Sequence, residues 1–122
     1  MERIYVSVDS ASTKETHKTY SYILEHSQGG KVARVEGSGM IYGTYHAATI
    51  SAITVALSRF TRPCEIEIIS ADDFVLSMMT KNLARWVLDG YITTQGKEVA
   101  NKDLWEQLWP LYMKHTITTR KE

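Results

Sequence analysis

The sequence predicts one mixed α/β domain, in which three antiparallel strands precede a helix and then parallel strands. Two features of the hydrophobic pattern carry this prediction. Three stretches before residue 42 alternate between apolar and polar side chains, whereas residues 44–60 repeat apolar side chains every three or four positions. Pro63 ends that helix, a strand pattern returns at residues 64–70, and a helix between two strands implies a parallel crossover. With a last strand at residues 115–120, we expect a mixed sheet of five strands.

Length and composition fit one globular domain that spans residues 1–122. Hydrophobic residues make up 43% of the chain and charged residues 23%, which is far from the range of disordered proteins. Fourteen basic residues balance 14 acidic residues, so no net charge draws the chain toward nucleic acid or an anionic membrane. The single cysteine and the lack of a long apolar stretch favour a cytoplasmic protein that makes no membrane contact.

Three antiparallel strands are expected in the first part of the chain. Alternating side chains place them at residues 4–8, 19–25 and 31–41. Gly29 and Gly30 supply the positive φ angles of a tight reversal between the second and third strands. Gly37 and Gly39 interrupt the third strand, and we interpret them as a bulge or a twist near its end.

Two further helices are expected before the last strand. Asp72 is placed to cap the first of them, which could bend between residues 78 and 82 and which ends at Gly90. Asn101 is placed to cap the second. Pro110 should kink or shorten that second helix, because proline lacks the N–H that bonds four residues back.

Residues 86–105 read WVLDGYITTQGKEVANKDLW, and this segment resembles the type 1 ribonucleases H. The shared pattern is a tryptophan, three residues, a glycine and an aromatic residue, then a lysine, valine and asparagine run that ends in Asp-Leu-Trp. Residues 7–10 (SVDS) are similar to the family's threonine-aspartate-glycine-serine motif, and residues 52–57 (AITVAL) to its alanine-rich first helix. The resemblance extends to Ile117 and implies the ribonuclease H fold.

The resemblance also implies a metal site built from four carboxylates. In the family, these acids hold two divalent cations, Mg²⁺ or Mn²⁺, across the scissile phosphate of the RNA strand in an RNA/DNA hybrid. Asp9 corresponds to the first acid, whereas Thr49, a weak neutral ligand, stands at the second position. The third acid corresponds to Asp72 or Asp73, of which we favour Asp72, and the fourth lies on a C-terminal helix that this chain lacks. Without the resemblance, Asp9 is an acid that caps a turn and Asp72 is a helix N-cap.

Few of the family's basic contacts to nucleic acid are matched. Val87, Leu88 and Asp89 replace the lysines and arginines that the family carries between its tryptophan and its glycine. The candidate phosphate contacts that remain are Lys81, Arg85 and Lys97. Solvated helix faces explain these three residues equally well, so the predicted affinity for nucleic acid is weak.

We therefore expect a ribonuclease H-like protein with an incomplete carboxylate cluster, which binds nucleic acid weakly or contacts a protein partner without catalysis. The alternative is a divalent-metal-dependent endoribonuclease that cleaves RNA in RNA/DNA hybrids, with a reduced site or a site completed by a second subunit. The four histidines show no ligand spacing, so no transition-metal site is expected. Because the missing helix covers part of one sheet face in the family, its absence predicts an apolar face that a second copy or another protein covers. A homodimer is the expected arrangement.

Overall fold

The computed structural model describes residues 1–122 as five strands and four helices. The strands are β1 (Glu2–Val8), β2 (Thr16–Gln28), β3 (Lys31–Gly43), β4 (Glu65–Ser70) and β5 (Thr116–Lys121). The helices are α1 (Tyr45–Ser58), α2 (Asp73–Lys81), α3 (Leu83–Leu88) and α4 (Lys102–Lys114). This order confirms the mixed α/β architecture that the change of hydrophobic period predicts.

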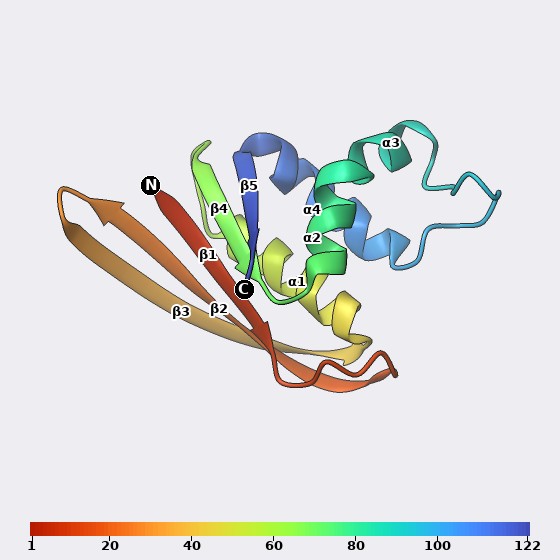
Figure 1. Cartoon of the computed structure of the whole chain (residues 1–122), viewed down its shortest axis with the longest axis horizontal. Coiled ribbons are helices and arrows are strands. Elements are labelled where there is room, and N and C mark those ends of the chain that lie inside the picture. The colour runs from red at the N-terminus through yellow and green to blue at the C-terminus, as the bar shows by residue number, and fades with distance from the viewer.

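The sheet has the strand order β3-β2-β1-β4-β5 (Figure 1). β1 pairs with β2, and β2 with β3, in antiparallel fashion, whereas β1 with β4 and β4 with β5 are parallel. The parallel pairing of β1 and β4 requires a crossover, which α1 supplies. Val6 lies opposite Ser70 at the end of this pairing, so the carboxyl ends of both strands meet at the same edge of the sheet.

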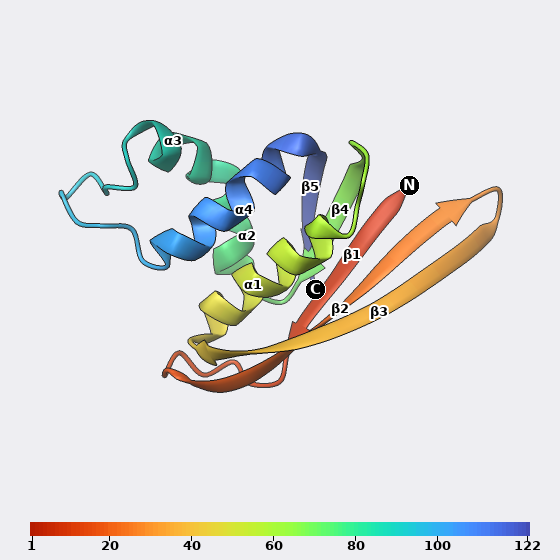
Figure 2. The ribbon, with the colours of Figure 1, turned by 180° about the vertical axis from the view of Figure 1, so that it is seen from behind.

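Helices α1 and α4 cover one face of the sheet (Figure 2). α1 packs on β1, β2 and β3, and α4 packs on α1. The side chains of Ile4 and Val6 from β1 and of Ile66 and Ile68 from β4 meet these helices in one core. No helix crosses β1, β2 or β3 on the other face, which is turned to the viewer in Figure 1. None of the four helices combines the length and the apolar character that crossing a membrane requires.

The helices of the second half agree with the predicted boundaries except at Pro110. α2 ends one residue before Asn82 and α3 begins one residue after it, so the predicted bend lies there. Gly90, with a φ of 71°, follows the end of α3. α4 continues past Pro110 to Lys114, and the helix packs on α1 and contacts β5. The proline therefore does not shorten it.

The interpretation of Gly37 and Gly39 as a bulge is wrong. β2 and β3 pair without interruption along their whole length, with Tyr22 opposite Gly37 and Tyr20 opposite Gly39. A Cβ at either glycine would overlap the ring of the tyrosine opposite it. The two glycines are needed because two buried tyrosine rings lie across the edge strand, which is another reason for glycine inside a strand.

Candidate functional site

Asp9 and Asp72 lie at the same edge of the sheet. Asp9 directly follows β1, and Asp72 comes two residues after the end of β4, the neighbouring parallel strand. The carboxyl ends of parallel strands are a common place for binding residues, because the loops there are free of the pairing inside the sheet. The fold thus places the two acids that the sequence singled out at one edge of the sheet.

Asp9 is exposed, but one of its carboxylate oxygens already has a backbone partner. Its N–H donates to the carbonyl of Thr19 at 3.0 Å, and the N–H of Thr19 donates to Oδ1 of Asp9 at 3.1 Å. Asp9 therefore extends the pairing of β1 with β2 by one residue. Its second oxygen, Oδ2, has no hydrogen-bond partner within the chain and faces solvent.

Asp72 is buried, and both of its carboxylate oxygens have protein partners. Only 1% of its side chain is exposed. Oδ1 accepts a hydrogen bond from the N–H of Val75 at 3.1 Å, which makes Asp72 the N-cap of α2. Nδ1 of His46 lies 2.8 Å from Oδ2 and 3.0 Å from Oδ1. Because a carboxylate only accepts hydrogen bonds, Nδ1 of His46 carries the hydrogen.

His46 is the functional side chain that sequence reasoning missed. It is the second residue of α1, its side chain is 29% exposed, and its ring packs against Phe74 of α2 with centroids 4.6 Å apart. The topology gives the signal that could have found it. β3 runs in the same direction as β1, so α1 starts at the edge where β1 and β4 end. That start places the first turn of α1 beside Asp72.

Thr49 and Asp73, the other two residues considered for the expected metal site, lie in different surroundings. Thr49 is fully buried on α1, and its hydroxyl donates to the carbonyl of Tyr45 at 3.1 Å. Asp73 is exposed in the first turn of α2, where the helix dipole favours an acid. Asp72, and not Asp73, is the acid that faces α1.

These residues do not fit a site for two divalent cations. Mg²⁺ and Mn²⁺ need several oxygen ligands with open lone pairs. His46 is bonded to both oxygens of Asp72, and the backbone holds one oxygen of Asp9. Nowhere in residues 1–122 do three His, Cys, Asp or Glu side chains lie close enough together to hold an ion.

Negative charge remains at this edge around Tyr45, the first residue of α1. Burial raises the pKa of the Tyr45 hydroxyl, and the charges of Asp72 and Glu122 raise it further. The N–H of Glu122 donates to the carbonyl of Ser70 at 2.9 Å, which places Glu122 beside the end of β4. A phenol with a raised pKa stays protonated at neutral pH, so Tyr45 adds no further negative charge.

A buried lysine fixes the loop between β1 and β2. Lys18 is 1% exposed, and its Nζ donates to the carbonyls of Lys14 and Gly43, each at 2.8 Å, and to the hydroxyl of Thr16 at 2.7 Å. All three acceptors are neutral oxygens. Because Gly43 ends β3 just before α1, the ammonium ties the loop that follows Asp9 to the start of that helix.

The three candidate phosphate contacts are all exposed and lie at the helical end of the molecule. Lys81 ends α2, Arg85 lies on α3, and Lys97 lies in the loop between α3 and α4. α3 and that loop project away from the sheet, at the opposite end from the tip of the β2–β3 hairpin (Figure 1). Arg85 donates to Oδ1 of Asn82 at 3.2 Å, and no carboxylate pairs with any of the three.

A row of charged side chains crosses the open face of the sheet, where an apolar face was expected. Arg3 on β1 lies 3.3 Å from Glu25 on β2 and 3.2 Å from Glu67 on β4. Arg34 on β3 extends this row at 2.9 Å from Glu25, and Arg120 on β5 extends it at 3.7 Å from Glu67. Cross-strand pairs of opposite charge stabilise a sheet in water, so this part of the face needs no cover.

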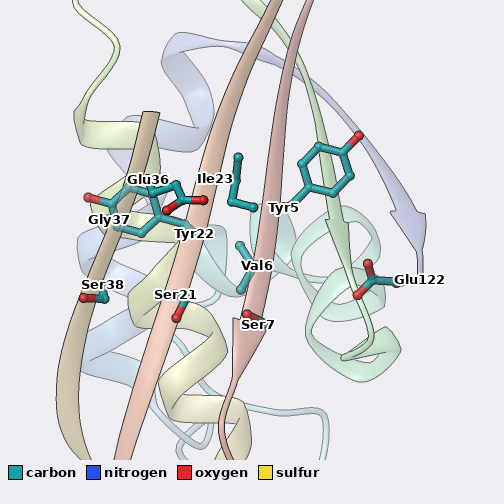
Figure 3. A pocket seen from close by; sticks show the side chains of 10 residues that line it. All are labelled: Tyr5, Val6, Ser7, Ser21, Tyr22, Ile23, Glu36, Gly37, Ser38 and Glu122. Carbon is teal, nitrogen blue, oxygen red and sulfur yellow. The ribbon is translucent and has the colours of Figure 1, made fainter. Parts of the chain in front are cut away.

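A shallow hollow of about 560 Å³ lies beside the charged row on the same face (Figure 3). Tyr5 and Ile23 are its main apolar side chains. Three serines, Ser7, Ser21 and Ser38, stand in a row across β1, β2 and β3 (Figure 3). Its apolar side chains are few, so this hollow gives no hydrophobic reason for the homodimer that was expected across the open face.

The chain is similar to ribonucleases H over its whole length. A family model described as RNase H matches residues 1–121. The ribonuclease H of Nitratidesulfovibrio vulgaris (strain DP4) is 34% identical over 83 residues, which are 67% of this chain and 53% of that protein. The ribonuclease H of Pelobacter propionicus is 29% identical over 99 residues, which are 81% of this chain and 59% of that protein. The chain thus spans little more than half the length of these curated relatives.

Solved structures show the same fold. LC9-RNase H1, described as a type 1 RNase H with the type 2 active-site motif, superposes with a TM-score of 0.82 at 13% identity, over 99% of this chain and 62% of that one. A foamy viral protease-reverse transcriptase in complex with an RNA/DNA hybrid superposes with a TM-score of 0.73 at 16% identity, over 98% of this chain and 17% of that one. The predicted ribonuclease H fold is confirmed.

Proposed function

Because the chain belongs to the ribonuclease H family, we propose that it is a non-catalytic member that binds nucleic acid weakly. The proposal has two parts, which rest on different residues. The loss of catalysis rests on the carboxylate edge of the sheet. The weak binding rests on the exposed cations at the helical end.

The pair of His46 and Asp72 is the observation that carries the first part. A cation that bound Asp72 would have to displace the imidazole from both carboxylate oxygens, in a place where 99% of the Asp72 side chain is shielded from water. Thr49 has no negative charge that would help to hold such a cation. Each ligand lost from a two-cation site removes transition-state stabilisation, and the rate falls tenfold for about every 1.4 kcal/mol lost. This supports a site without hydrolytic activity.

A cleavage assay tests the first part. Purified protein is incubated with an RNA/DNA hybrid in Mg²⁺ or Mn²⁺, beside an Asp9→Asn variant prepared in the same way. We expect no cleavage by either protein above the background of a mock preparation. Cleavage by the wild type that the substitution abolishes would overturn the proposal.

Weak nucleic-acid binding follows from the small number of free cations. Lys81, Arg85 and Lys97 are exposed and have no acidic partner, but the chain as a whole carries no net charge. Each phosphate contact contributes roughly 0.9 to the slope of log affinity against log salt concentration on duplex DNA. Three contacts would give a slope of about −3, which is small for a specific nucleic-acid-binding protein.

Binding of a labelled RNA/DNA hybrid at several salt concentrations tests the second part. Alanine at Arg85 or Lys97 should reduce the slope by about one unit each. Lys31→Ala is the matched control, because Lys31 is equally exposed but lies at the turn of the β2–β3 hairpin, at the other end of the molecule. If the slope of each variant equals that of the wild type, Arg85 and Lys97 at the helical end make no phosphate contacts.

One observation favours the alternative, a divalent-metal-dependent ribonuclease. Oδ2 of Asp9 is free and faces solvent at the same edge as Asp72. A single Mg²⁺ or Mn²⁺ with Asp9 as a ligand, completed by Asp73 or by an acid of a second subunit, is the form that such a reduced site would take. The cleavage assay separates the two functions, because only the alternative predicts activity that depends on Asp9.

A further inference from the structure

The outer edge of β3 is the longest unpaired strand edge in the molecule. β3 has 13 residues, contains no proline, and stands at the end of the sheet in both ribbon views (Figures 1 and 2). Four of the nine exposed large hydrophobic side chains of the chain belong to this strand. They are Val32, Val35, Met40 and Tyr42. Such an edge is a ready template for another strand.

The turn of the hairpin determines which backbone groups of β3 point outward. Gly29 and Gly30 form a two-residue turn with φ of 59° and 78°, so Gln28 and Lys31 make the closing hydrogen-bonded pair. Bonded positions alternate in an antiparallel ladder, so odd-numbered residues of β3 bond to β2. The N–H and C=O groups of the even-numbered residues, among them Arg34 and Glu36, therefore point away from the sheet.

We infer that two copies of this chain pair antiparallel through β3, with the twofold axis at Val35. In this register, Arg34 lies opposite Glu36 of the partner subunit, and the symmetry repeats the pair on the other side of the axis. Both residues have outward-pointing backbone groups, so they form hydrogen-bonded pairs across the interface. The overlap covers residues 31–39 of each copy.

The charges select this register over its neighbours. Antiparallel pairing allows the axis at any residue of β3. An axis at Arg34 would place two arginines opposite each other, and an axis at Glu36 would place two glutamates opposite each other, and both arrangements are unfavourable. An axis at Ala33 or Gly37 leaves each charge opposite an uncharged residue. Only the axis at Val35 matches opposite charges.

The side chains are already placed for this contact. Arg34 is held on the open face by Glu25 at 2.9 Å, whereas Glu36 is exposed and has no ion pair within the chain. Glu36 therefore gains a partner on association. Val35 is 49% exposed on the helix-covered side, and at a pair without hydrogen bonds it would meet the partner's Val35 with Cα atoms about 4.5 Å apart. The interface thus buries apolar surface on one side and pairs charge on the other.

This interface goes beyond the proposed function, because it depends neither on Asp72 nor on nucleic acid. It would join the two sheets into one continuous sheet of ten strands. It also replaces the contact across the open face as the site of self-association, since that face satisfies its own charges.

Light scattering and sedimentation of the charge variants test the inference. We expect the wild type at high micromolar concentration to have twice the 13.9 kDa mass of one chain. Arg34→Glu and Glu36→Arg each place like charges opposite each other twice, and each should raise the dissociation constant at least about tenfold. An equimolar mixture of the two variants should recover the dimer, because the heterodimer restores opposite charges at both positions.

The controls separate the interface from folding. Glu106→Arg makes the same change of charge on an exposed position of α4 and should leave the dimer intact. Circular dichroism checks that each variant is folded, and Glu36→Arg disturbs no ion pair of the single chain. A monomeric wild type would overturn the inference. A dimer that survives Glu36→Arg, or a mixture of the two variants that stays monomeric, would overturn the proposed register.

Discussion

A double-mutant cycle on His46 and Asp72 measures the interaction that occupies both carboxylate oxygens of Asp72. His46→Ala leaves a carboxylate with 1% exposure and only the N–H of Val75 as a partner. Leaving a buried acceptor without its hydrogen-bond donor costs about 1 to 3 kcal/mol, and more when the acceptor is charged. Because His46 is 29% exposed, water can replace part of the lost interaction, and we expect about 1.5 to 3 kcal/mol of destabilisation.

The Asp72 substitution of the cycle separates the energy of the His46–Asp72 interaction from that of the helix N-cap. Asp72→Asn keeps an oxygen that can accept from Val75, so the N-cap of α2 survives while the charge is lost. The coupling energy between the two substitutions should be about 1 to 2 kcal/mol. Urea unfolding followed by circular dichroism at one fixed pH and salt concentration gives all four free energies of unfolding. His17→Ala is the matched control, because His17 packs on Tyr42 and pairs with no carboxylate.

A coupling energy below about 0.5 kcal/mol would refute the reasoning, since it would show that Asp72 does not depend on His46. Addition of Mn²⁺ tests whether the oxygens of Asp72 are available to a cation. A ligand that binds only the folded state raises its stability. We expect no change for the wild type, because both Asp72 oxygens are taken.

Three further predictions concern other parts of the fold. Gly37→Ala should destabilise the protein by about 2 kcal/mol in urea unfolding, because the new Cβ displaces the ring of Tyr22, whereas a gain in stability would show that the ring moves freely. Lys18→Met should cost about 2 to 4 kcal/mol by the same measurement, since the carbonyls of Lys14 and Gly43 lose their donor, and an unchanged stability would count against the role of Lys18 in holding this loop. His115 should make the folded state less stable as the pH falls. Its Nδ1 accepts a hydrogen bond from the N–H of Cys64 at 3.1 Å. Burial, and then the nearby charge of Lys114, lower the pKa of His115 below its usual 6.5. The contribution is complete above about pH 6.5 and is lost as the pH falls toward the lowered pKa, so His115→Asn should flatten the acid side of a melting-temperature profile relative to wild type.

The strand order was predictable because it depends on features that one sequence contains. The change from alternation to helical spacing after residue 42 requires a crossover, and the crossover requires β4 to run parallel to β1. Strand lengths were less predictable. β2 and β3 each run to 13 residues, longer than the alternating segments in the sequence, because backbone pairing continues through residues whose side chains do not alternate. Gly37 was misread for a related reason, since the tyrosine that requires it lies on another strand.

The candidate site was predictable only in part. Asp9 and Asp72 follow strand patterns in the sequence, and parallel neighbours end at one edge, so their common location could be inferred. The partner of Asp72 could not be inferred from spacing. It comes from α1, 26 residues earlier, and its contact depends on how the first turn of that helix is rotated over the sheet edge. His46 therefore looked like one of four scattered histidines.

The same burial that makes Asp72 a firm helix cap also determines which partner it takes. An acid at the start of a helix needs one oxygen for the backbone, and when it is buried its other oxygen also needs a polar partner. A divalent cation could be that partner only with several more oxygen ligands around it, which the expected site draws in part from an acid on α1. Thr49 stands at that position and supplies no acid, whereas His46, in the first turn of the same helix, donates a hydrogen bond to Asp72 without any further ligand. Under the proposed function, the residues at positions 46 and 49 of α1, more than the presence of Asp9 and Asp72, therefore decide whether this sheet edge binds a cation or stabilises the fold.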